Sequence, residues 1–178
     1  MKSSFTGLLI IDWQERLAPA MPATLYQQAL HRATTLKWLF ESLNLPIYTT
    51  EQYPRGLGET VVDLQPVEAM PKTTFSIMAD NHIFNQLMLS NTKHFFVVGM
   101  ETHICVYQSA IDLLEHGKEI TVCSNACMSR KKIDWKTALA DLQLKGANIK
   151  TAEMILFDLI KDAKHPLFKE LSRRIKQF

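Results

Sequence analysis

The residue best suited to chemistry in this sequence is Cys105, because of the elements that flank it. Phe95–Val98 is an apolar run with the length and the β-branched or aromatic content of a buried strand. Gly99 ends the run, Thr102 has the residue type of a helix N-cap, and Ile104–Leu114 carries apolar residues at helical spacing. The pattern predicts Cys105 in the first turn of a helix, where the dipole and free N–H groups favour a thiolate nucleophile. The alternative interpretation is a small buried core residue.

Two charged residues end other predicted strands and complete a candidate catalytic group. Asp12 closes the apolar run Leu8–Ile11, and Lys72 ends a short predicted strand. A thiol needs a base to become a nucleophile, and a cation stabilises the resulting anion, so Asp12 can be the base and Lys72 the cation. Each has an ordinary explanation alone, since a strand-end Asp is often a helix cap and a Lys is usually solvent-exposed. Their coincidence with Cys105 at one sheet edge indicates a catalytic site.

Strands and helices alternate along the chain, which predicts an α/β fold in three layers (α/β/α) around a doubly wound, mostly parallel sheet of about six strands. Ligands bind such sheets where strand order reverses, and in the common order the first and fourth strands flank that point. Asp12 and Cys105 follow those two strands and are therefore expected to meet. The predicted strands cover residues 8–11, 47–50, 95–98, 119–122 and 147–150, together with a short strand and turn at 71–76. The predicted helices cover 23–43, 81–89, 104–114, 134–144 (capped by Asp134), 152–159 and 166–177, with loops at 51–58 and 124–132.

Length and composition limit the classes of function. The 178 residues suit a single domain, 1–178, and the net charge of +2 requires neither nucleic acid nor a membrane as partner. No apolar stretch has the length of a signal peptide or a transmembrane helix. The cysteines Cys105, Cys123 and Cys127 are odd in number, which argues for a reducing compartment. We therefore expect a cytoplasmic protein in which Cys123 and Cys127 are structural.

Three stretches make the chain similar to a known family: Ile10–Gln14, Pro71–Ser76 and Val98–Val106. On these residues the chain resembles the isochorismatase-like cysteine hydrolases, whose fold is Rossmann-like and which include nicotinamidases, N-carbamoylsarcosine amidohydrolases and ureido-group hydrolases. The resemblance covers essentially the whole chain. Thr50–Gly58 and Asp162–Glu170 are similar to the branch of isochorismatase-domain-containing hydrolases, and these motifs are specific for the family but weak for the substrate.

The resemblance implies a catalytic triad of Asp12, Lys72 and Cys105. It also implies a cis peptide between Met100 and Glu101, and an oxyanion hole made by the backbone N–H groups of Glu101 and Cys105. Isochorismatases proper do not use the cysteine nucleophile, so the presence of Cys105 favours cleavage of a C–N bond in a small amide or ureide through a thioacyl-enzyme. The resemblance further implies a homo-oligomer, from dimers up to octamers.

One departure from the family concerns the metal. Nicotinamidases carry a metal site in the loop after the second strand, built from an Asp and two His. This chain has Glu51-Gln52-Tyr53 there, and the next histidine is His82. Because a borderline metal prefers imidazole or thiolate ligands, we predict no metal and no other cofactor.

Four residues flank the triad on the same loops and are predicted to border the pocket for a small-molecule substrate: Gln14, Tyr53, Phe75 and His103. Phe75 can stack on a planar substrate or be a core aromatic. The basic run Arg130–Lys132 is most simply solvated surface, which does not favour nucleic acid as a partner.

Two alternatives to the enzyme stay open. The first is a non-catalytic binding or scaffold protein that keeps the fold, and the second is an RNA-associated protein. A depressed pKa of the Cys105 thiol, seen as fast alkylation near neutral pH, would favour the enzyme over the scaffold. RNA binding that falls steeply as salt rises would favour the second alternative.

Overall fold

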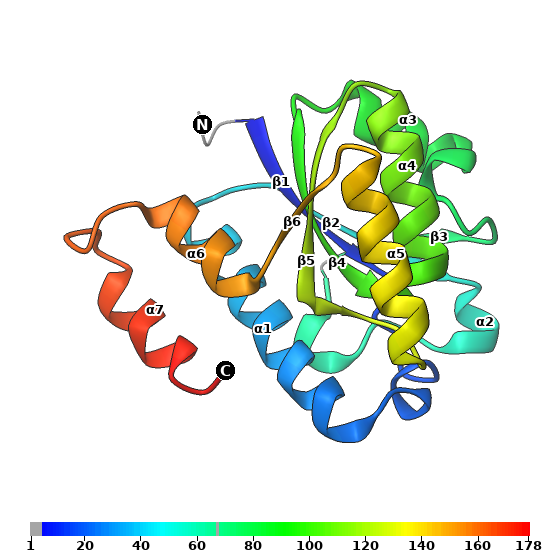
Figure 1. Cartoon of the computed structure of the whole chain (residues 1–178). Helices are drawn as coiled ribbons and strands as arrows, with labels where there is room; N and C mark the ends of the chain where they lie inside the picture. The colour runs from blue at the N-terminus through cyan, green and yellow to red at the C-terminus, as the bar shows by residue number, and fades with distance from the viewer. Residues whose placement is uncertain (1–4, 67) are drawn as a thin grey trace.

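A parallel β-sheet forms the centre of the computed structural model, which describes residues 5–66 and 68–178 (Figure 1). The strand order is β3-β2-β1-β4-β5-β6, and each neighbouring pair is parallel. The sequence-based prediction of a three-layer α/β fold is therefore confirmed. The strands are β1 (Thr6–Ile11), β2 (Ile47–Gln52), β3 (Met70–Lys72), β4 (His94–Met100), β5 (Glu119–Met128) and β6 (Asn148–Lys150).

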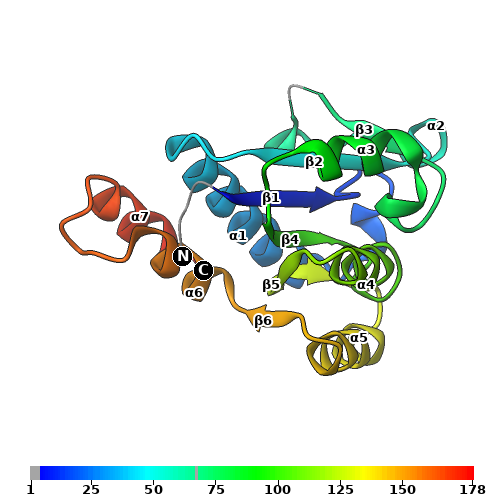
Figure 2. The same cartoon turned by 90° about the horizontal axis from the view of Figure 1, so that it is seen from above.

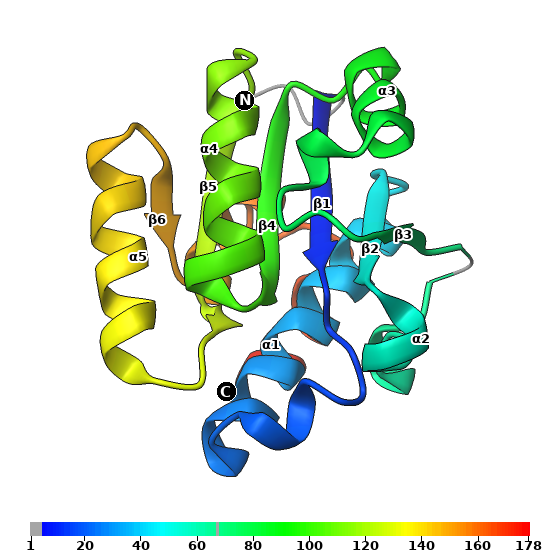
Figure 3. The ribbon, with the colours of Figure 1, turned by 90° about the vertical axis from the view of Figure 1, so that its right-hand side faces the viewer.

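Helices cover both faces of the sheet (Figures 2 and 3). Helices α1 (Ala23–Ser42), α6 (Ala152–Ile160) and α7 (Phe168–Ile175) lie on one side, and α3 (Asn81–Leu89), α4 (Tyr107–Glu115) and α5 (Lys132–Leu144) lie on the other. Successive residues of β1 alternate between two apolar cores, with Leu8 and Ile10 packed in the core beneath α1 and Leu9 and Ile11 in the core beneath α4. Both faces of the central strands are thus buried, as their continuous apolar sequences require.

Strand order reverses between β1 and β4, the point at which the sequence predicts the site. The close approach of these strands depends on Gly99. A Cβ atom at this position would lie 2.7 Å from the Ile11 carbonyl oxygen and 2.8 Å from Val106 Cγ2. A larger residue would therefore push apart β1, β4 and the turn that follows β4.

The predicted loop at residues 124–132 is wrong, because β5 continues to Met128. A register shift opposite Val97 and Gly99 of β4 lets β5 bulge and then pair again. Asn125, a residue type common in loops, lies within this irregular part of the strand. The turn-forming residues therefore mark a bulge inside the strand.

Helix boundaries differ from the expected ones at three further places. Helix α5 starts with Lys131 as its N-cap, so Asp134 lies in the first turn and does not cap it. Helix α7 begins at Phe168, after Pro166. The predicted Pro/Gly loop after β2 contains the short helix α2 (Pro54–Leu57). Within the described residues, no helix is both long and apolar enough to cross a bilayer.

Candidate active site

Asp12 and Lys72 form a buried ion pair at the carboxyl edge of the sheet. Asp12 directly follows β1, and Lys72 is the last residue of β3. Lys72 Nζ lies 2.7 Å from Asp12 Oδ2, and neither side chain has exposed surface. Asp12 adopts a φ of +53°, in the left-handed region that Asp tolerates better than most residues. The structure thus brings two of the three predicted triad residues into direct contact.

Further hydrogen bonds surround this ion pair. The Thr50 hydroxyl donates to Asp12 Oδ1 at 2.8 Å. Lys72 Nζ donates to Gln52 Oε1 at 2.6 Å and to the Thr74 carbonyl oxygen at 3.1 Å. A buried ion pair is tolerated only when its remaining donors and acceptors are also bonded, and these contacts meet that requirement.

Cys105 lies in a single π-helical turn, Thr102–Val106, between β4 and α4, and only 6% of its surface is exposed. Burial raises the pKa of the Cys105 thiol to about 12, the charge of Asp12 and its hydrogen bond act in the same sense, and Lys72 opposes them. The expectation of a depressed pKa is therefore wrong. At neutral pH Cys105 is a thiol beside a carboxylate, so it must lose its proton to a base before or during attack.

The residue before this turn, Glu101, is tied to the end of β5. The Met100–Glu101 peptide bond is cis. The Glu101 carboxylate accepts hydrogen bonds from the backbone N–H of Arg130 at 3.0 Å and from its Nε at 3.0 and 3.1 Å. Sequence reasoning assigned Arg130 to solvated surface and missed this contact. The available signal was its position just after β5, the strand next to β4.

The first two residues of the turn differ from expectation. Thr102 does not cap a helix, because it is itself helical and its buried hydroxyl has no hydrogen-bond partner among the described residues. His103 Nδ1 lies 2.9 Å from Ser129 Oγ, and His103 Nε2 lies 3.9 Å from Asp134 Oδ2. The His103 ring is therefore bound to the segment after β5.

Gln14 has no exposed surface. Its Nε2 donates to the carbonyl oxygens of Gln52 at 3.0 Å and Gly58 at 2.7 Å, and its Oε1 accepts from the Gln52 N–H at 2.8 Å. The structure thus gives Gln14 a positioning role, joining the loop after β1 to the loop after β2, in place of the predicted substrate contact.

Tyr53 and Phe75 lie at the surface, each with 54% of its area exposed. The interpretation of Phe75 as a core aromatic is therefore wrong. Tyr53 lines a cavity of about 400 Å³ together with Pro54, Arg55, Pro71, Lys72, Thr73 and Asp80. Lys72 thus lines this cavity, whereas Cys105 does not.

Glu51, predicted to lie in the loop after the second strand, belongs to β2 and uses its carboxylate internally. Glu51 Oε1 accepts hydrogen bonds from the backbone N–H and the hydroxyl of Thr60, both at 2.7 Å. Across residues 5–66 and 68–178, no group of three or more His, Cys, Asp or Glu side chains is arranged to hold a metal ion.

Comparison with known proteins identifies the family. The sequence model described as Isochorismatase domain matches residues 6–154. The chain belongs to the isochorismatase family. Isochorismatase domain-containing protein 2A of Mus musculus is 34% identical over 174 residues, covering 96% of this chain and 82% of the mouse protein. Isochorismatase family protein 1A of Dictyostelium discoideum is 41% identical over 138 residues, covering 72% of this chain and 66% of that protein.

A solved structure, of the MAR1 ribonuclease from Caenorhabditis elegans, superposes on this isochorismatase-family chain with a TM-score of 0.86 and 30% sequence identity. The superposition covers 99% of this chain and 92% of the nematode protein. The prediction of an isochorismatase-like protein of the domain-containing branch is confirmed. Membership of the isochorismatase family indicates a hydrolase.

Proposed function

We propose that this protein is a metal-independent cysteine hydrolase that cleaves the C–N bond of a small amide or ureide through a thioacyl-enzyme intermediate. The observation that carries the proposal is the buried Asp12–Lys72 pair beside the Cys105 thiol. Replacing a buried ion pair with apolar residues is often neutral or stabilising, so stability alone gives little reason to keep one. A catalytic role explains a buried charged pair that lies beside a thiol at the switch point of the sheet.

In the first half of the reaction Asp12 takes the proton of the Cys105 thiol while sulfur attacks the carbonyl carbon of the substrate. The S–C bond forms, and the π electron pair of the carbonyl moves to oxygen. When the tetrahedral intermediate collapses, the C–N bond breaks and the leaving nitrogen takes the proton from Asp12. Lys72 remains protonated and offsets the negative charge that passes between carboxylate and sulfur.

In the second half water adds to the thioester carbonyl while Asp12 takes one of its protons. The S–C bond then breaks, the sulfur recovers a proton from Asp12, and the acid product leaves. Because burial raises the pKa of the Cys105 thiol, a free thiolate is not the resting form, and transfer of the proton to Asp12 must accompany the attack of sulfur.

The backbone N–H groups of Glu101 and Cys105 are the proposed donors to the oxyanion. In support, the Glu101 N–H donates to no acceptor in the part of the chain that the structure describes, although Glu101 is buried. A buried, unused N–H beside a nucleophile is a donor available to a developing negative charge. Such donors typically contribute a few kcal/mol at the transition state.

The proposal includes no metal because of Glu51 and Gln52, the last two residues of β2. Glu51 already accepts two hydrogen bonds from Thr60, and the neighbouring Gln52 holds Lys72. These side chains have a structural use that coordination of a metal would disrupt.

The test compares the wild-type protein with Cys105→Ala against a panel of short-chain amides and ureides. We expect ammonia or amine release by the wild type alone, and a mass increase equal to the acyl group on intact wild-type protein quenched during turnover. Equal turnover by both proteins would contradict the assignment of the nucleophile. Dialysis of the wild type against a chelator should leave turnover unchanged.

A ribonuclease is the second candidate, favoured by the 30% identity and TM-score of 0.86 to the nematode protein that bears this name. Incubation of a labelled single-stranded RNA with the wild type and Cys105→Ala distinguishes the two functions. Cleavage of RNA by both, with no turnover of amides, would favour the ribonuclease. Neither activity, with a Cys105 that does not react with alkylating reagents, would favour the non-catalytic scaffold.

We further propose a homo-oligomer in the cytoplasm. The homo-oligomer follows the family resemblance, and the cytoplasmic location follows the cysteine usage, with all three cysteines free. Light scattering on the eluted protein tests the assembly, and fractionation of cells tests the location.

A further inference from the structure

The contact between Glu101 and Arg130 is unusual for an exposed arginine. The side chain of Glu101 is 7% exposed, whereas that of Arg130 is 58% exposed. Arg130 reaches from the surface to a buried carboxylate and binds it through its backbone N–H and its Nε, across a separation of 29 residues in the sequence. An exposed ion pair alone contributes little stability, so the effect of this pair depends on what Glu101 does.

Glu101 organises the turn that carries the nucleophile. Its carbonyl oxygen accepts the N–H of Ile104 at 3.1 Å and the N–H of Val106 at 3.3 Å, on either side of Cys105. Its own N–H has no backbone acceptor outside the regular helices and strands of the described residues. The orientation of this one residue therefore sets both the shape of the turn and the direction of the free donor.

A second contact ties the same turn to the same segment. His103 Nδ1 lies 2.9 Å from the hydroxyl of Ser129, the residue that precedes Arg130. Two residues of the β4–α4 connection are thus bound to two consecutive residues after β5. The Glu101 carboxylate is buried, so loss of the guanidinium would leave it with too few hydrogen-bond partners. The carboxylate would then favour a position nearer to water, and the Glu101 backbone would move with it.

We propose that Arg130 is a positioning residue: by binding the Glu101 carboxylate, it aims the Glu101 N–H at the oxygen anion formed during attack by Cys105. The inference rests on the proposed function and adds to it a residue that acts through Glu101 and does not touch the reacting atoms. A misplacement of about 1 Å in a catalytic group can cost about a hundredfold in rate, so a surface residue can affect catalysis this way.

The test uses two reagents that need different parts of the site. Iodoacetamide alkylates Cys105 by displacing iodide, with no oxyanion. Propionaldehyde adds the Cys105 S–H across its C=O bond, with sulfur on carbon and the proton on oxygen, and the carbonyl oxygen takes up negative charge on the way. The propionaldehyde adduct protects Cys105 from alkylation by iodoacetamide. In Arg130→Gln, the concentration of propionaldehyde needed for half-maximal protection should rise about tenfold. The rate of alkylation without propionaldehyde should stay within about twofold of wild type.

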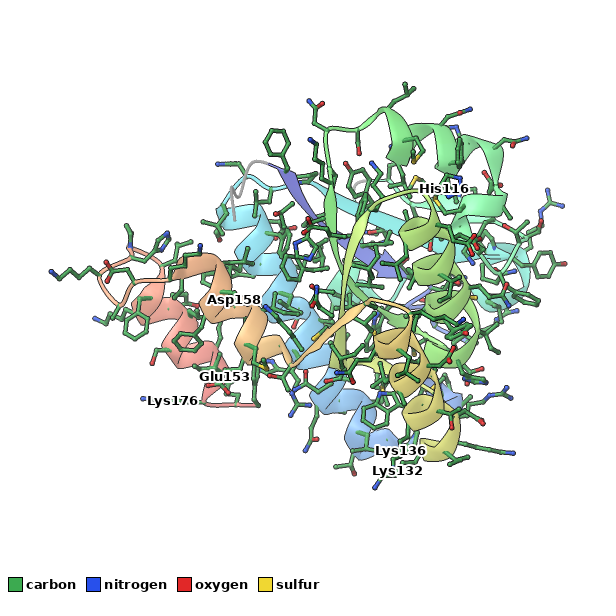
Figure 4. The ribbon with its side chains drawn as sticks, turned by 45° about the horizontal axis from the view of Figure 1, so that its top comes forward. His116, Lys132, Lys136, Glu153, Asp158 and Lys176 are labelled. Atoms are coloured by element: carbon green, nitrogen blue, oxygen red, sulfur yellow. The ribbon has the colours of Figure 1, made fainter. Side chains whose placement is uncertain are left out.

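Three matched variants sharpen the result. Lys132→Gln makes the same change of charge nearby on a residue that projects from the outer side of α5 and should behave as wild type (Figure 4). Arg130→Lys should recover part of the protection, because it restores the charge without the guanidinium geometry. Glu101→Gln keeps the backbone N–H and should lose about as much as Arg130→Gln, and the double variant should lose no more than either single variant.

The outcomes separate this inference from the proposed function. Equal protection by propionaldehyde in the wild type and Arg130→Gln would overturn the inference and leave the nucleophile untouched. Parallel losses of alkylation and protection in Arg130→Gln would also overturn it, because they would mean general damage to the site. A wild-type Cys105 that reacts with neither reagent would overturn the proposed function and the inference with it.

Discussion

Lys72 Nζ lies 2.7 Å from Asp12 Oδ2 in a fully buried position, although 60 residues separate the two in sequence. Only the sheet topology joins them, since Asp12 follows the central strand β1 and Lys72 ends the edge strand β3. Strand β2 lies between, and its Thr50 and Gln52 bond to the two charges. The pair is therefore a tertiary feature that spans three neighbouring strands, and the first two predictions below depend on it.

Removal of one partner of this buried pair should be costly. Lys72→Met leaves the Asp12 carboxylate buried without its cation, which should lower the free energy of unfolding by about 3–5 kcal/mol in urea denaturation. Lys37→Met is the matched control. It breaks the pair with Glu41 on the surface of α1, where the carboxylate is 53% exposed, and should cost about 0.5 kcal/mol. Similar losses of unfolding free energy in Lys72→Met and Lys37→Met would contradict the prediction that the buried pair matters more for stability than the exposed pair.

The protonation of Cys105 provides a second prediction. Because its thiol has a pKa raised to about 12, the rate of alkylation by iodoacetamide should climb about tenfold per pH unit from pH 7 to 10 without a plateau. Asp12→Asn removes the negative charge that raises this pKa and leaves Lys72, which lowers it. This variant should therefore alkylate about tenfold faster than wild type at pH 8 while losing hydrolysis. Labelling measured by intact mass, with Cys105→Ala as blank, checks both rates. A plateau below pH 9 in the wild type would refute the raised pKa.

The topology, and the placement of Asp12 and Cys105 at one edge of the sheet, could be predicted because they follow from local patterns. Continuous apolar runs such as Leu8–Ile11 mark buried parallel strands, and right-handed crossovers restrict the order in which those strands lie side by side. Once β1 and β4 flank the switch point, Asp12 and the turn with Cys105 must share an edge. Only the types of these residues and their positions after strands were needed.

The roles of other residues could not be predicted, because they depend on contacts that no local pattern encodes. Gln14 follows Asp12 closely and so suggested a substrate contact, but its amide is used by the backbone of Gln52, the last residue of β2. Arg130 lies in a basic run whose simplest interpretation is solvation, and its contact with Glu101 requires the bulge that carries β5 to Met128. The pKa of Cys105 depends on burial, which a helix-turn argument omits.

The positioning role of Gln14 leads to the third prediction. Gln14→Ala removes three hydrogen bonds and leaves backbone groups of Gln52 and Gly58 without partners. We expect the free energy of unfolding to fall by about 2–4 kcal/mol, measured in urea. Gln27→Ala, on the exposed surface of α1, should change it by less than about 0.5 kcal/mol. A Gln14→Ala protein with wild-type stability and a raised KM would instead support the substrate contact.

The last prediction concerns stability and pH at the far end of the sheet. His94, at the start of β4, is 7% exposed. Its Nε2 lies 2.8 Å from Thr121 Oγ1, and its Nδ1 has no hydrogen-bond partner among the described residues. Burial lowers the pKa of His94, the nearby carboxylate of Glu119 acts in the opposite sense, and Lys150 adds to the lowering. The folded protein therefore favours neutral His94 more strongly than the unfolded chain does.

It follows that the unfolded chain binds the His94 proton more readily than the folded protein does. The contribution of His94 to the free energy of unfolding is therefore fully present above the unfolded pKa of about 6.5. This contribution is lost as the pH falls from that value to the lowered pKa of the folded state. The free energy of unfolding should drop between pH 7 and pH 5 with a slope of at most about 1.4 kcal/mol per pH unit from this group. His94→Gln keeps a hydrogen-bonding side chain without the titration and should flatten that slope in urea denaturations at pH 5, 6, 7 and 8. His82→Gln changes an exposed histidine of α3 and should keep the wild-type slope, so equal slopes in all three proteins would exclude His94 as the source.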